Sequence, residues 1–312
     1  MDNSFEEIID QLSKEVSGKE TSLCIGTFDG VHIGHQKLFN ELVKISKKNN
    51  LLSIVLVFEL RPREIINPST TRPYIIPFEE RIQNIKSQEV DKAVKINFDN
   101  NLRNISAKKF LGILKNKINL TSLVVSEDTR IGNDQINGND LNKICHELSI
   151  NYHSIKMSSD HEKIVSSSSV STHISNGEIE KANSMLGRTF SLTGKVETGD
   201  KIGRTINIPT ANLSVSDGLI IPGDGIYAAK VEVNNRIYKG ALSIGNRPVI
   251  KGDDSRKIEV YIIDFNKNIY GELIEISIIS KVRDQENYDS LEELRLQIDK
   301  DITQITNILK NA

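Results

Sequence analysis

The residues with the clearest capacity for chemistry are His32 and His35, which lie three positions apart at the start of a predicted helix. They follow a turn that contains Gly26, Gly30 and Gly34, where the missing side chains let the backbone approach a ligand closely. The free N–H groups and positive dipole end of a helix that begins here favour an anion. Both imidazoles can therefore face one phosphate and donate to its oxygens as charge develops. The segment predicts phosphoryl or nucleotidyl transfer.

The histidine pair also has two simpler interpretations. A helix with an ordinary N-terminal cap can carry two histidines that do no chemistry, and a glycine turn alone does not exclude this case. Two histidines at this spacing can also bind zinc, although the sequence offers no obvious third ligand. The longer pattern described below favours the phosphate interpretation.

A second set of residues suited to phosphate chemistry lies past the middle of the chain. Three glycines within ten residues predict a flap that can lie over phosphates, with Arg204 as a nearby charge: Gly194, Gly199 and Gly203. After Pro209, the Thr210 hydroxyl and the Asn212 side-chain carbonyl are hard oxygen donors two positions apart. If their segment is a strand, both share one face and can hold one Mg²⁺. An ordinary turn is the simpler interpretation of this segment by itself.

The size and charge of the chain limit the classes of protein to which it can belong. Its 312 residues, at about 150 per domain, predict two domains. With 40 Lys+Arg against 42 Asp+Glu, the net charge is −2. This composition excludes a bulk electrostatic attraction to nucleic acid or to an anionic membrane. Cys24 and Cys145 are too few for a disulfide framework, so we expect free core thiols.

The N-terminal segment and the apolar runs bear on location. The acidic start of the chain lacks the basic and apolar regions of a signal peptide. The longest apolar run, 51–58, is far shorter than the roughly 20 residues needed to span a bilayer. We therefore expect a cytoplasmic protein.

The first half of the chain alternates between strand-like and helix-like patterns, which predicts a parallel α/β sheet with right-handed crossovers. The expected strands are 22–26, 51–58, 92–96, 122–126 and 151–156, and the expected helices are 35–48, 78–87, 107–115 and 140–148. Such sheets bind ligands at the carboxyl ends of their strands, which is where the histidine turn falls. We place the boundary of this Rossmann-like domain at residue 184.

The second half, 185–312, carries short β-rich runs separated by glycine and proline turns, a pattern that predicts a small antiparallel barrel or sandwich. The expected strands lie within 191–196, 225–235, 237–245, 258–266 and 272–280. Apolar residues at spacings of three and four then predict a terminal helix over 290–309.

The histidine turn in its long form carries a resemblance to a known family. The string from Gly26 to His35, GTFDGVHIGH, matches the HxGH signature of the nucleotidyltransferase superfamily. It resembles the adenylyltransferase half of bacterial bifunctional riboflavin kinase/FAD synthetases, which transfers AMP from ATP to FMN. This resemblance implies that His32 and His35 stabilise charge on the α-phosphate. The implied nucleotide-binding residues of the turn are Gly26, Thr27, Phe28, Asp29 and Gly34.

Further segments resemble the same family in the right order. Residues 58–64 resemble its FEPHPRE segment, 124–132 its VVGxDFRFG segment, and 165–168 the start of its SSTxxR phosphate loop. The last match explains the serine-rich patch as a hydroxyl-lined turn before a helix. The ligand-binding residues implied by these matches are Asp128, Arg130, Ser166, Ser167 and Ser168.

This half also departs from the family pattern. The arginine that closes SSTxxR, and that meets the ATP phosphates in the family, is replaced by Ser171. Loss of such a ligand removes about 1.5–3 kcal/mol of hydrogen bonding, or roughly ten- to a hundredfold in rate, unless a neighbour substitutes. The candidates to substitute are Lys163, Arg130 and Arg188. The other departures are Leu60 and Arg61 for Pro-His, and Thr129 and Ile131 for two aromatic residues.

The second half resembles riboflavin kinases more closely. Residues 194–213 resemble the signature GxVxxGxxxGRxxGxPTANL, with Asn207 in place of one glycine. The resemblance implies that Thr210 and Asn212 contact Mg²⁺ and ATP, and that the glycines, Arg204 and Pro209 belong to the nucleotide site. Residues 258–265 resemble LEVHLLDF, which makes Glu259 the implied catalytic base. Arg283 lies in a segment that closes over flavin and nucleotide in the family.

These observations predict a two-domain enzyme with riboflavin, FMN and ATP as substrates, Mg²⁺ as metal, and no nucleic-acid or membrane partner. The barrel would make FMN from riboflavin and ATP, and the α/β domain would make FAD from FMN and ATP. One alternative is an active kinase with an impaired adenylyltransferase, because of Ser171. A more remote alternative is a regulator that binds flavin or nucleotide without catalysis. The sequence gives no indication of the oligomeric state.

Overall fold

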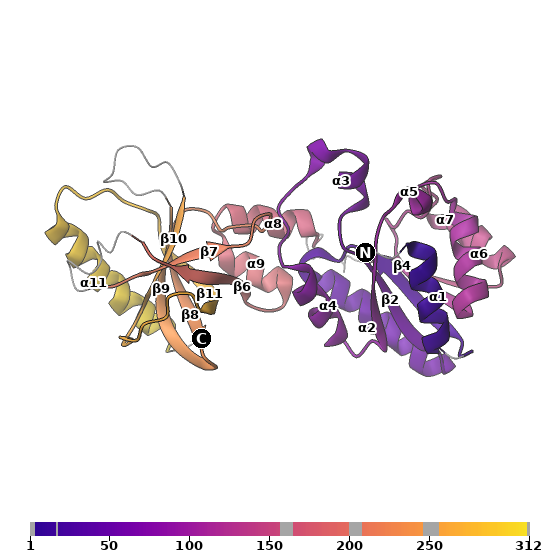
Figure 1. Ribbon diagram of the computed structural model, residues 1–312, viewed down its shortest axis with the longest axis horizontal. Helices are drawn as coiled ribbons and strands as arrows, with labels where there is room; N and C mark the ends of the chain where they lie inside the picture. The colour runs from indigo at the N-terminus through magenta and orange to yellow at the C-terminus, as the bar shows by residue number, and fades with distance from the viewer. Residues whose placement is uncertain (1–3, 17, 157–164, 200–207, 246–255, 311–312) are drawn as a thin grey trace. The chain divides into compact units, whose positions relative to one another are not determined.

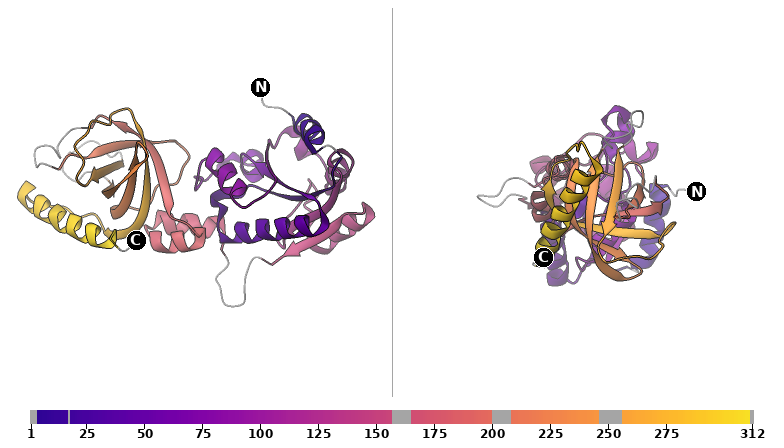
Figure 2. Two further views of the ribbon diagram at one scale, coloured as in Figure 1. Left: turned by 90° about the horizontal axis from the view of Figure 1, so that it is seen from below. Right: turned by 90° about the vertical axis from the view of Figure 1, so that its left-hand side faces the viewer.

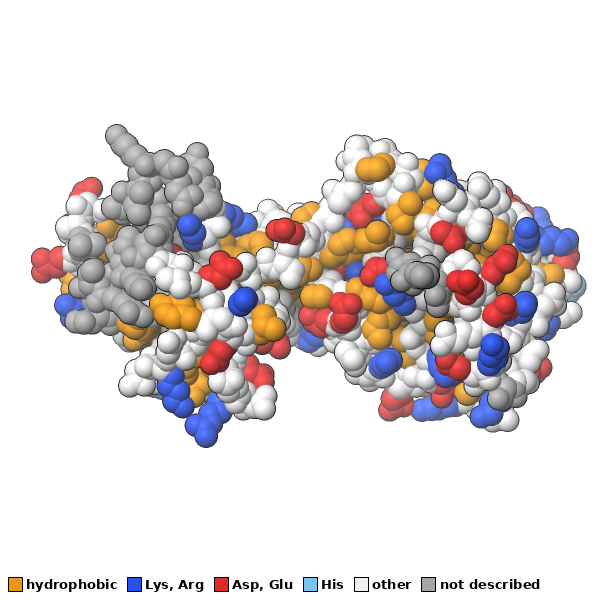
Figure 3. All heavy atoms as spheres, in the orientation of Figure 1, with side chains coloured by type: hydrophobic (Ala, Val, Ile, Leu, Met, Phe, Trp, Pro, Cys, Tyr) orange, Lys and Arg blue, Asp and Glu red, His pale blue; other side chains and the backbone are white. Residues whose placement is uncertain are grey.

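The computed structural model describes residues 4–16, 18–156, 165–199, 208–245 and 256–310. By their contacts, the residues form two compact units, 1–167 and 168–312. The contacts thus group residues 168–184 with the second unit, whereas the sequence analysis places the boundary after residue 184. On the face shown in Figure 3, basic and acidic side chains are interspersed over both units, in keeping with the nearly balanced charge of the sequence.

A five-stranded parallel sheet forms the centre of the first unit (Figure 1). Its strand order is β3-β2-β1-β4-β5, and each neighbouring pair is parallel. The strands are β1 (Thr21–Gly26), β2 (Leu52–Phe58), β3 (Lys92–Ile96), β4 (Leu120–Ser126) and β5 (Asn151–Ile155). The predicted α/β class is confirmed, and the expected strand bounds differ from these by at most two residues.

Helices cover both faces of this sheet, and α1 and α2 lie on opposite sides of it (Figure 2). The helices of the unit are α1 (Phe5–Val16), α2 (Ile33–Asn49), α3 (Pro62–Ile66), α4 (Phe78–Lys86), α5 (Asn100–Arg103), α6 (Ala107–Ile118) and α7 (Gly138–Glu147), with short 3₁₀ turns η1 (Asp29–Val31) and η2 (Pro68–Thr70). Helix α2 packs on β1, β2 and β4, and α4 packs beside β3. Helices α1, α6 and α7 share one apolar cluster with the strands.

Helix α1 was not among the expected elements. Ser4 and Glu7 form a reciprocal cap, in which the Ser4 N–H donates to Glu7 Oε2 (2.9 Å) and the Glu7 N–H donates to Ser4 Oγ (3.3 Å). Phe5, Ile9 and Leu12 then recur on one buried face and pack toward α6. Both signals, the cap and the spacing, are present in the sequence.

The alternation of side chains along the strands divides the core between the two faces. Leu23, Leu56 and Leu123 belong to the cluster with α1 and α6, while Cys24 and Val55, at alternating positions, are buried outside that cluster. Both cysteines are free and buried, as expected. Burial raises the pKa of the Cys145 thiol to about 11 and raises that of Cys24 further. Neither thiol is therefore suited to nucleophilic chemistry.

The second unit is built on a closed barrel in the strand order β10-β7-β6-β11-β8-β9, with antiparallel pairing throughout. Its strands are β6 (Phe190–Glu197), β7 (Ala211–Val215), β8 (Gly225–Val233), β9 (Arg236–Gly245), β10 (Lys257–Ile262) and β11 (Leu273–Arg283). The predicted barrel is confirmed, and β7 is a further strand beyond the expected runs. Asn234 and Asn235, both at positive φ, form the tight turn between β8 and β9.

In the described part of the chain, three helices lie before and after the barrel strands in sequence: α8 (Ser167–Ser175), α9 (Ile179–Leu186) and the terminal α11 (Leu291–Ile308). Helix α9 packs on β11 and β6. Helix α11 packs on β8, β9 and β11, where Ile305 and Leu309 meet Ile226 and Ala228. Ser290 caps α11 by accepting from the Glu293 N–H (3.2 Å), and the expected terminal helix is confirmed.

Candidate active sites

The histidine turn follows β1 at the point where the strand order of the parallel sheet reverses. Strand β2 pairs with β1 on one side and β4 pairs with it on the other, so the segments that leave β1 and β4 diverge. Open parallel sheets bind ligands at this place, outside the carboxyl ends of the strands. The turn that carries His32 and His35 is therefore at the position expected for a ligand site.

The backbone of the turn adopts a conformation that few side chains allow. Phe28 (φ 52°), Gly30 (φ 77°) and Val31 (φ 42°) all lie in the left-handed region. Such a conformation is unfavourable for a β-branched residue such as Val31 and marks a segment held by its surroundings. A side chain at Gly30 would place its Cβ 2.8 Å from Ile75 Cδ1. Glycine suits this position because of its φ, and any side chain here would also force the Ile75 side chain to move.

The two histidines stack at the start of α2. Their ring centroids are 3.6 Å apart with an interplanar angle of 20°. His32 is the N-cap residue, and its Nδ1 accepts from the His35 N–H (3.4 Å). Because Nδ1 accepts, the proton of a neutral His32 lies on Nε2, which is then a donor. The N-cap contact of His32 therefore also fixes its tautomer. With the proton on Nε2, the ring can donate a hydrogen bond to a phosphate oxygen.

His35 is held in an environment that favours its neutral form. Burial, the neighbouring His32 and the charge of Arg81 together hold the pKa of His35 well below its ordinary value. The edge of the Phe28 ring packs against the His35 imidazole, with centroids 5.3 Å apart. His35 Nδ1 is buried and has no hydrogen-bond partner among the described residues. A buried polar atom without a partner is uncommon, which makes this imidazole a candidate for a functional role.

Asp29 anchors the turn through an arginine that departs from the family pattern. The buried Asp29 carboxylate accepts from the Ile75 N–H (3.0 Å) and from Arg61 Nη2 (2.6 Å). Arg61 also pairs with Glu64 (2.5 Å) and stacks on the Tyr74 ring, 3.9 Å from its centroid. Since Arg61 bridges two carboxylates, its substitution for the family histidine has a structural explanation. In the structure, the Asp29 carboxylate holds the turn in place through these hydrogen bonds, and its predicted contact with nucleotide stays a prediction.

Arg81 is a second arginine of this region, and sequence reasoning missed it. Its side chain is 1% exposed, and its Nη1 donates to the carbonyl oxygens of Thr27 (3.1 Å), Phe58 (2.9 Å) and Glu59 (3.2 Å). These carbonyls lie where β1 and β2 end. Its spacing in the sequence could have indicated that it is buried, because Arg81 lies three residues after Phe78 and four before Ile85, on the buried face of α4.

The other predicted residues of this domain lie around the same turn or on nearby loops. Ser167 Oγ donates to the Asp29 carbonyl (2.9 Å), which joins the start of the serine segment to the histidine turn. Past the end of β4, Asp128 accepts from Ser126 Oγ (2.6 Å), and Asp128 and Arg130 are exposed. Ser166 precedes α8, which begins at Ser167, so the serine patch does lead into a helix. Gly34 is buried in the first turn of α2.

In the barrel, two strands bring together the residues predicted for the kinase. Strands β7 and β10 pair with Asn212 directly opposite Glu259, so their side chains share one face. Thr210, two positions before Asn212, donates from Oγ1 to Glu259 Oε2 (2.8 Å). The predicted base and the two predicted metal ligands are thus neighbours, although 49 residues separate Thr210 from Glu259.

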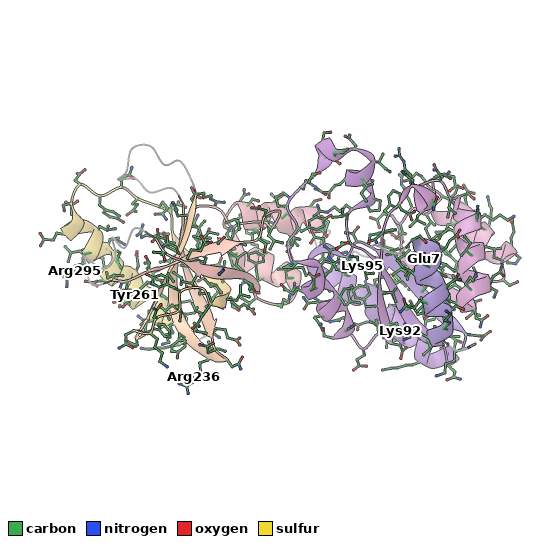
Figure 4. The ribbon with its side chains drawn as sticks, viewed as in Figure 1. Glu7, Lys92, Lys95, Arg236, Tyr261 and Arg295 are labelled. Carbon is green, nitrogen blue, oxygen red and sulfur yellow. The ribbon has the colours of Figure 1, made fainter. Side chains whose placement is uncertain are left out.

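A cavity of about 510 Å³, large enough for a nucleotide-sized ligand, opens beside Thr210, while Asn212 and Glu259 are not among the residues that line it. Pro209, Thr210 and Ala211 line one side of it, and the segment from Phe265 to Tyr270 lines another. Val260 and Ile262 of β10 both line the cavity. Tyr261 lies between them in sequence, is labelled in Figure 4, and is not among the lining residues.

The predicted glycines of the kinase segment fall partly inside the described residues. A Cβ at Gly199 would lie 2.1 Å from Asn212 Nδ2, so the backbone there passes directly over the Asn212 amide. A Cβ at Gly194 would lie 3.0 Å from both Leu213 Cδ2 and the Ser214 carbonyl oxygen. Gly203 and Arg204 lie outside the described residues.

Arg283, the last residue of β11, contacts the terminal helix α11 through Asp301. Its guanidinium pairs with the buried Asp301 carboxylate, at 2.7 Å from Nη2 to Oδ2 and 3.0 Å from Nε to Oδ1. Tyr288 lies 5.9 Å from the guanidinium carbon. Arg283 therefore holds α11 against the end of β11, and its predicted contact with flavin and nucleotide stays a prediction.

Two further properties bear on the alternatives. Within the described parts of the chain, no three His, Cys, Asp or Glu side chains are grouped so that they could hold a metal ion, which leaves the zinc interpretation of the histidine pair without a third ligand. None of the helices that the structure describes combines the length and apolar character needed to cross a bilayer.

The fold and the two sites define a class of protein: an α/β domain of the nucleotidyltransferase type followed by a barrel of the flavokinase type. The FAD synthetase family model matches residues 14–169, and the riboflavin kinase family model matches residues 186–309. A bifunctional riboflavin kinase/FMN adenylyltransferase of Buchnera aphidicola (subsp. Acyrthosiphon pisum, strain APS) is 36% identical over 306 residues, which are 96% of this chain and 97% of that protein.

The protein of the same name from Bacillus subtilis (strain 168) is 30% identical over 303 residues, 93% of this chain and 92% of its own. The chain belongs to the bifunctional riboflavin kinase/FMN adenylyltransferase family. A crystal structure described as a macrolide-efflux protein from Streptococcus pneumoniae is also similar, with a TM-score of 0.85 and 27% identity over 95% of this chain and 97% of that one. This last likeness concerns the fold.

Proposed function

We propose that the two domains catalyse consecutive steps, in which the barrel makes FMN and the α/β domain makes FAD. Family membership supports both activities, since both enzyme domains are present and relatives that span the whole chain carry both names. The observation that carries the assignment of residues is the contact of Thr210 with Glu259 in one domain and the stacked pair of His32 and His35 in the other. Flavin and ATP are the substrates.

In the barrel, Glu259 acts as the general base. The 5′-hydroxyl oxygen of riboflavin attacks the γ-phosphorus of ATP, the bond to the β-phosphate oxygen breaks, and ADP leaves. Glu259 takes the hydroxyl proton, since a carboxylate beside the attacking oxygen can accept it. The hydrogen bond from Thr210 Oγ1 fixes the orientation of this carboxylate. The cavity beside Thr210 accommodates the nucleotide.

Thr210 and Asn212 would hold the divalent metal that enzymes of these families typically use with ATP, and we propose Mg²⁺. Their oxygens fit a hard cation, because the Thr210 proton points to Glu259 and leaves its lone pairs available. Two protein ligands suffice, since Mg²⁺ keeps most of its waters and binds substrate phosphates. When bound, the ion neutralises charge that develops on the transferred phosphoryl group.

In the α/β domain, a phosphate oxygen of FMN attacks the α-phosphorus of ATP, the α–β bond breaks, and pyrophosphate leaves. His32 donates from Nε2 to an oxygen of the α-phosphate, and the N–H groups at the start of α2 assist. Neutral His35 stacks on His32 and keeps it in place. Little covalent help is needed, so positioning and electrostatics supply most of the rate.

Product chromatography tests this proposal. The purified chain is incubated with riboflavin, ATP and Mg²⁺, and separately with FMN, ATP and Mg²⁺. The proposal predicts FMN and FAD in the first reaction and FAD in the second. FMN without any FAD would favour the kinase with an impaired adenylyltransferase. No conversion in either reaction would favour the binding regulator.

The second candidate, a kinase with a weak adenylyltransferase, rests on Ser171. If the missing arginine limits the reaction, Ser171→Arg raises the rate of FAD formation by about tenfold or more. An unchanged rate would show that position 171 does not limit it. The Ser171→Lys variant gives a charge-matched comparison without the forked geometry of an arginine.

A further inference from the structure

Within the described parts of the chain, the buried guanidinium of Arg81 forms no ion pair with a carboxylate. Among the residues that the structure describes, the acids whose charge reaches it are Asp29 and Glu59. Each of them holds another cation: Asp29 pairs with Arg61 (2.6 Å), and Glu59 pairs with Lys95 (2.6 Å), which Figure 4 labels on β3. Buried charges without an opposite charge are costly, so such a residue requires an explanation.

The contacts of Arg81 point to the histidine turn. One nitrogen, Nη1, holds three carbonyl oxygens, of which that of Thr27 lies just before the turn and those of Phe58 and Glu59 lie at the end of β2. The Nε atom is buried and has no hydrogen-bond partner in the described part of the chain. The guanidinium also lies 5.0 Å from the centroid of the Tyr74 ring and 5.3 Å from that of Phe78.

We propose that Arg81 is a positioning residue for adenylyl transfer: it ties the start of the histidine turn to the end of β2 and adds positive charge to the wall of the phosphate site. The inference rests on the proposed function of the α/β domain. Arg81 differs from Arg61, whose guanidinium forms ion pairs with the carboxylates of Asp29 and Glu64. Arg81 was not among the three cations expected to substitute for the arginine that is absent at position 171.

The charge of Arg81 acts on His35 as well as on the incoming phosphates. It is one of three causes that hold the pKa of His35 low, after burial and the neighbouring His32. The other ionisable groups that face this region are Asp29, Glu59, Arg61 and Tyr74. Removing the charge of Arg81 therefore raises the pKa of His35 and makes it easier to protonate.

Three variants of the full chain separate this role from simple packing. Arg81→Met keeps an apolar stem of similar length but loses the charge and the donors. Arg81→Lys keeps a charge and three donors, which match the three carbonyls. Lys86→Met is the control, since Lys86 is an exposed residue of the same helix with the same charge. FAD formation from FMN and ATP is measured over a range of pH, with KM for ATP and kcat separated.

We expect Arg81→Met to lower kcat/KM for adenylyl transfer by about 10- to 100-fold, the effect of losing a charged hydrogen-bonding group. Its rate should fall at a higher pH on acidification, because His35 protonates more readily. Arg81→Lys should remain within about threefold of the original chain, and Lys86→Met should be unchanged. Riboflavin kinase activity of each preparation and its thermal unfolding report that the chain is folded.

The outcomes distinguish the two levels of the proposal. If the original chain forms no FAD, the proposed function fails and this inference with it. If the original chain is active and folded Arg81→Met matches it in rate and pH profile, only this inference is overturned. A lysine variant as impaired as the methionine variant would also overturn it. Should Arg81→Met not fold, Arg81→Gln, which keeps donors without charge, must show the same loss and the same shift of the pH profile.

Discussion

In the α/β domain, the groups proposed to face the phosphate come from one stretch, 26–35, whereas in the barrel Thr210 meets Glu259 across 49 residues of sequence. The first site is shaped by a strained turn with three residues at positive φ. The second is set by the register of β7 against β10, which places Asn212 opposite Glu259. One site therefore depends on local conformation and its supports, and the other on strand pairing.

This difference has consequences for how each site can fail. A turn held in the left-handed region needs outside support, and Arg61 and Arg81 give it from two sides. A paired strand needs less support from other side chains, because the backbone hydrogen bonds that form the barrel also align its side chains with those of the neighbouring strand. We expect adenylyltransferase activity to be lowered by substitution of residues that do not touch substrate. We expect kinase activity to be lowered mainly by substitution of residues that contact substrate or metal.

The largest effect is expected from Glu259→Gln. This change removes the proposed base while keeping the shape and a partner for Thr210, so FMN formation should fall by about 10²- to 10⁴-fold. FAD formation from FMN should be unaffected, and it serves as the control for folding. Undiminished FMN formation would remove Glu259 from the mechanism.

A somewhat smaller loss is expected from His32→Asn. The amide can still cap α2, but it cannot donate from the position of Nε2, so FAD formation from FMN should fall by about 10²- to 10³-fold. Kinase activity should not change. An effect on KM for ATP alone, with kcat preserved, would contradict a role in the transition state.

The terminal helix provides a test that concerns stability. Asp301→Asn removes the charge that Arg283 faces in a mostly buried pair, and we expect the barrel to lose about 2 kcal/mol of unfolding free energy. Denaturant unfolding of the variant, followed with kinase activity, measures this loss. Asp299→Asn, at an exposed position of α11 two residues before Asp301, is the matched control. Equal stability of the two variants would show that the pair contributes nothing.

The smallest effect is a pH dependence that belongs to the α/β domain. In the folded chain His35 has a pKa well below 6.5, while in the unfolded chain it has its ordinary value, so below about pH 6.5 the unfolded chain binds the extra proton. Unfolding free energy should therefore fall on acidification, by up to about 1 kcal/mol per pH unit. His35→Asn should remove this dependence in calorimetry. An unchanged slope would place the acid sensitivity elsewhere.

The sequence allowed much of the fold to be predicted, because alternation and helical spacing are local signals. The five parallel strands and the terminal helix follow from such patterns. Helix α1 carried the same signals, including the cap formed by Ser4 and Glu7, and was overlooked. Strand β7 was missed as a run because it has only five residues and begins two residues after Pro209.

The sites were predictable to different degrees. His32 and His35 share one helix turn, so their proximity follows from spacing alone. The contact of Thr210 with Glu259 depends on strand register, which the sequence suggested only through resemblance to riboflavin kinases. Arg61 and Arg81 could not be assigned as supports, since their partners Asp29 and Thr27 lie 32 and 54 residues away. Contacts between distant segments need the fold itself.

If one chain holds two separate catalytic sites, two variants that each lack one site should complement each other. Glu259→Gln and His32→Asn proteins are mixed with riboflavin, ATP and Mg²⁺, and FAD is measured by chromatography. We expect the mixture to make FAD, because FMN released by the His32→Asn protein is used by the Glu259→Gln protein. Each variant alone, and the protein with both changes, should make almost none. A mixture that makes FMN but no FAD, although the Glu259→Gln protein converts added FMN, would contradict independent sites.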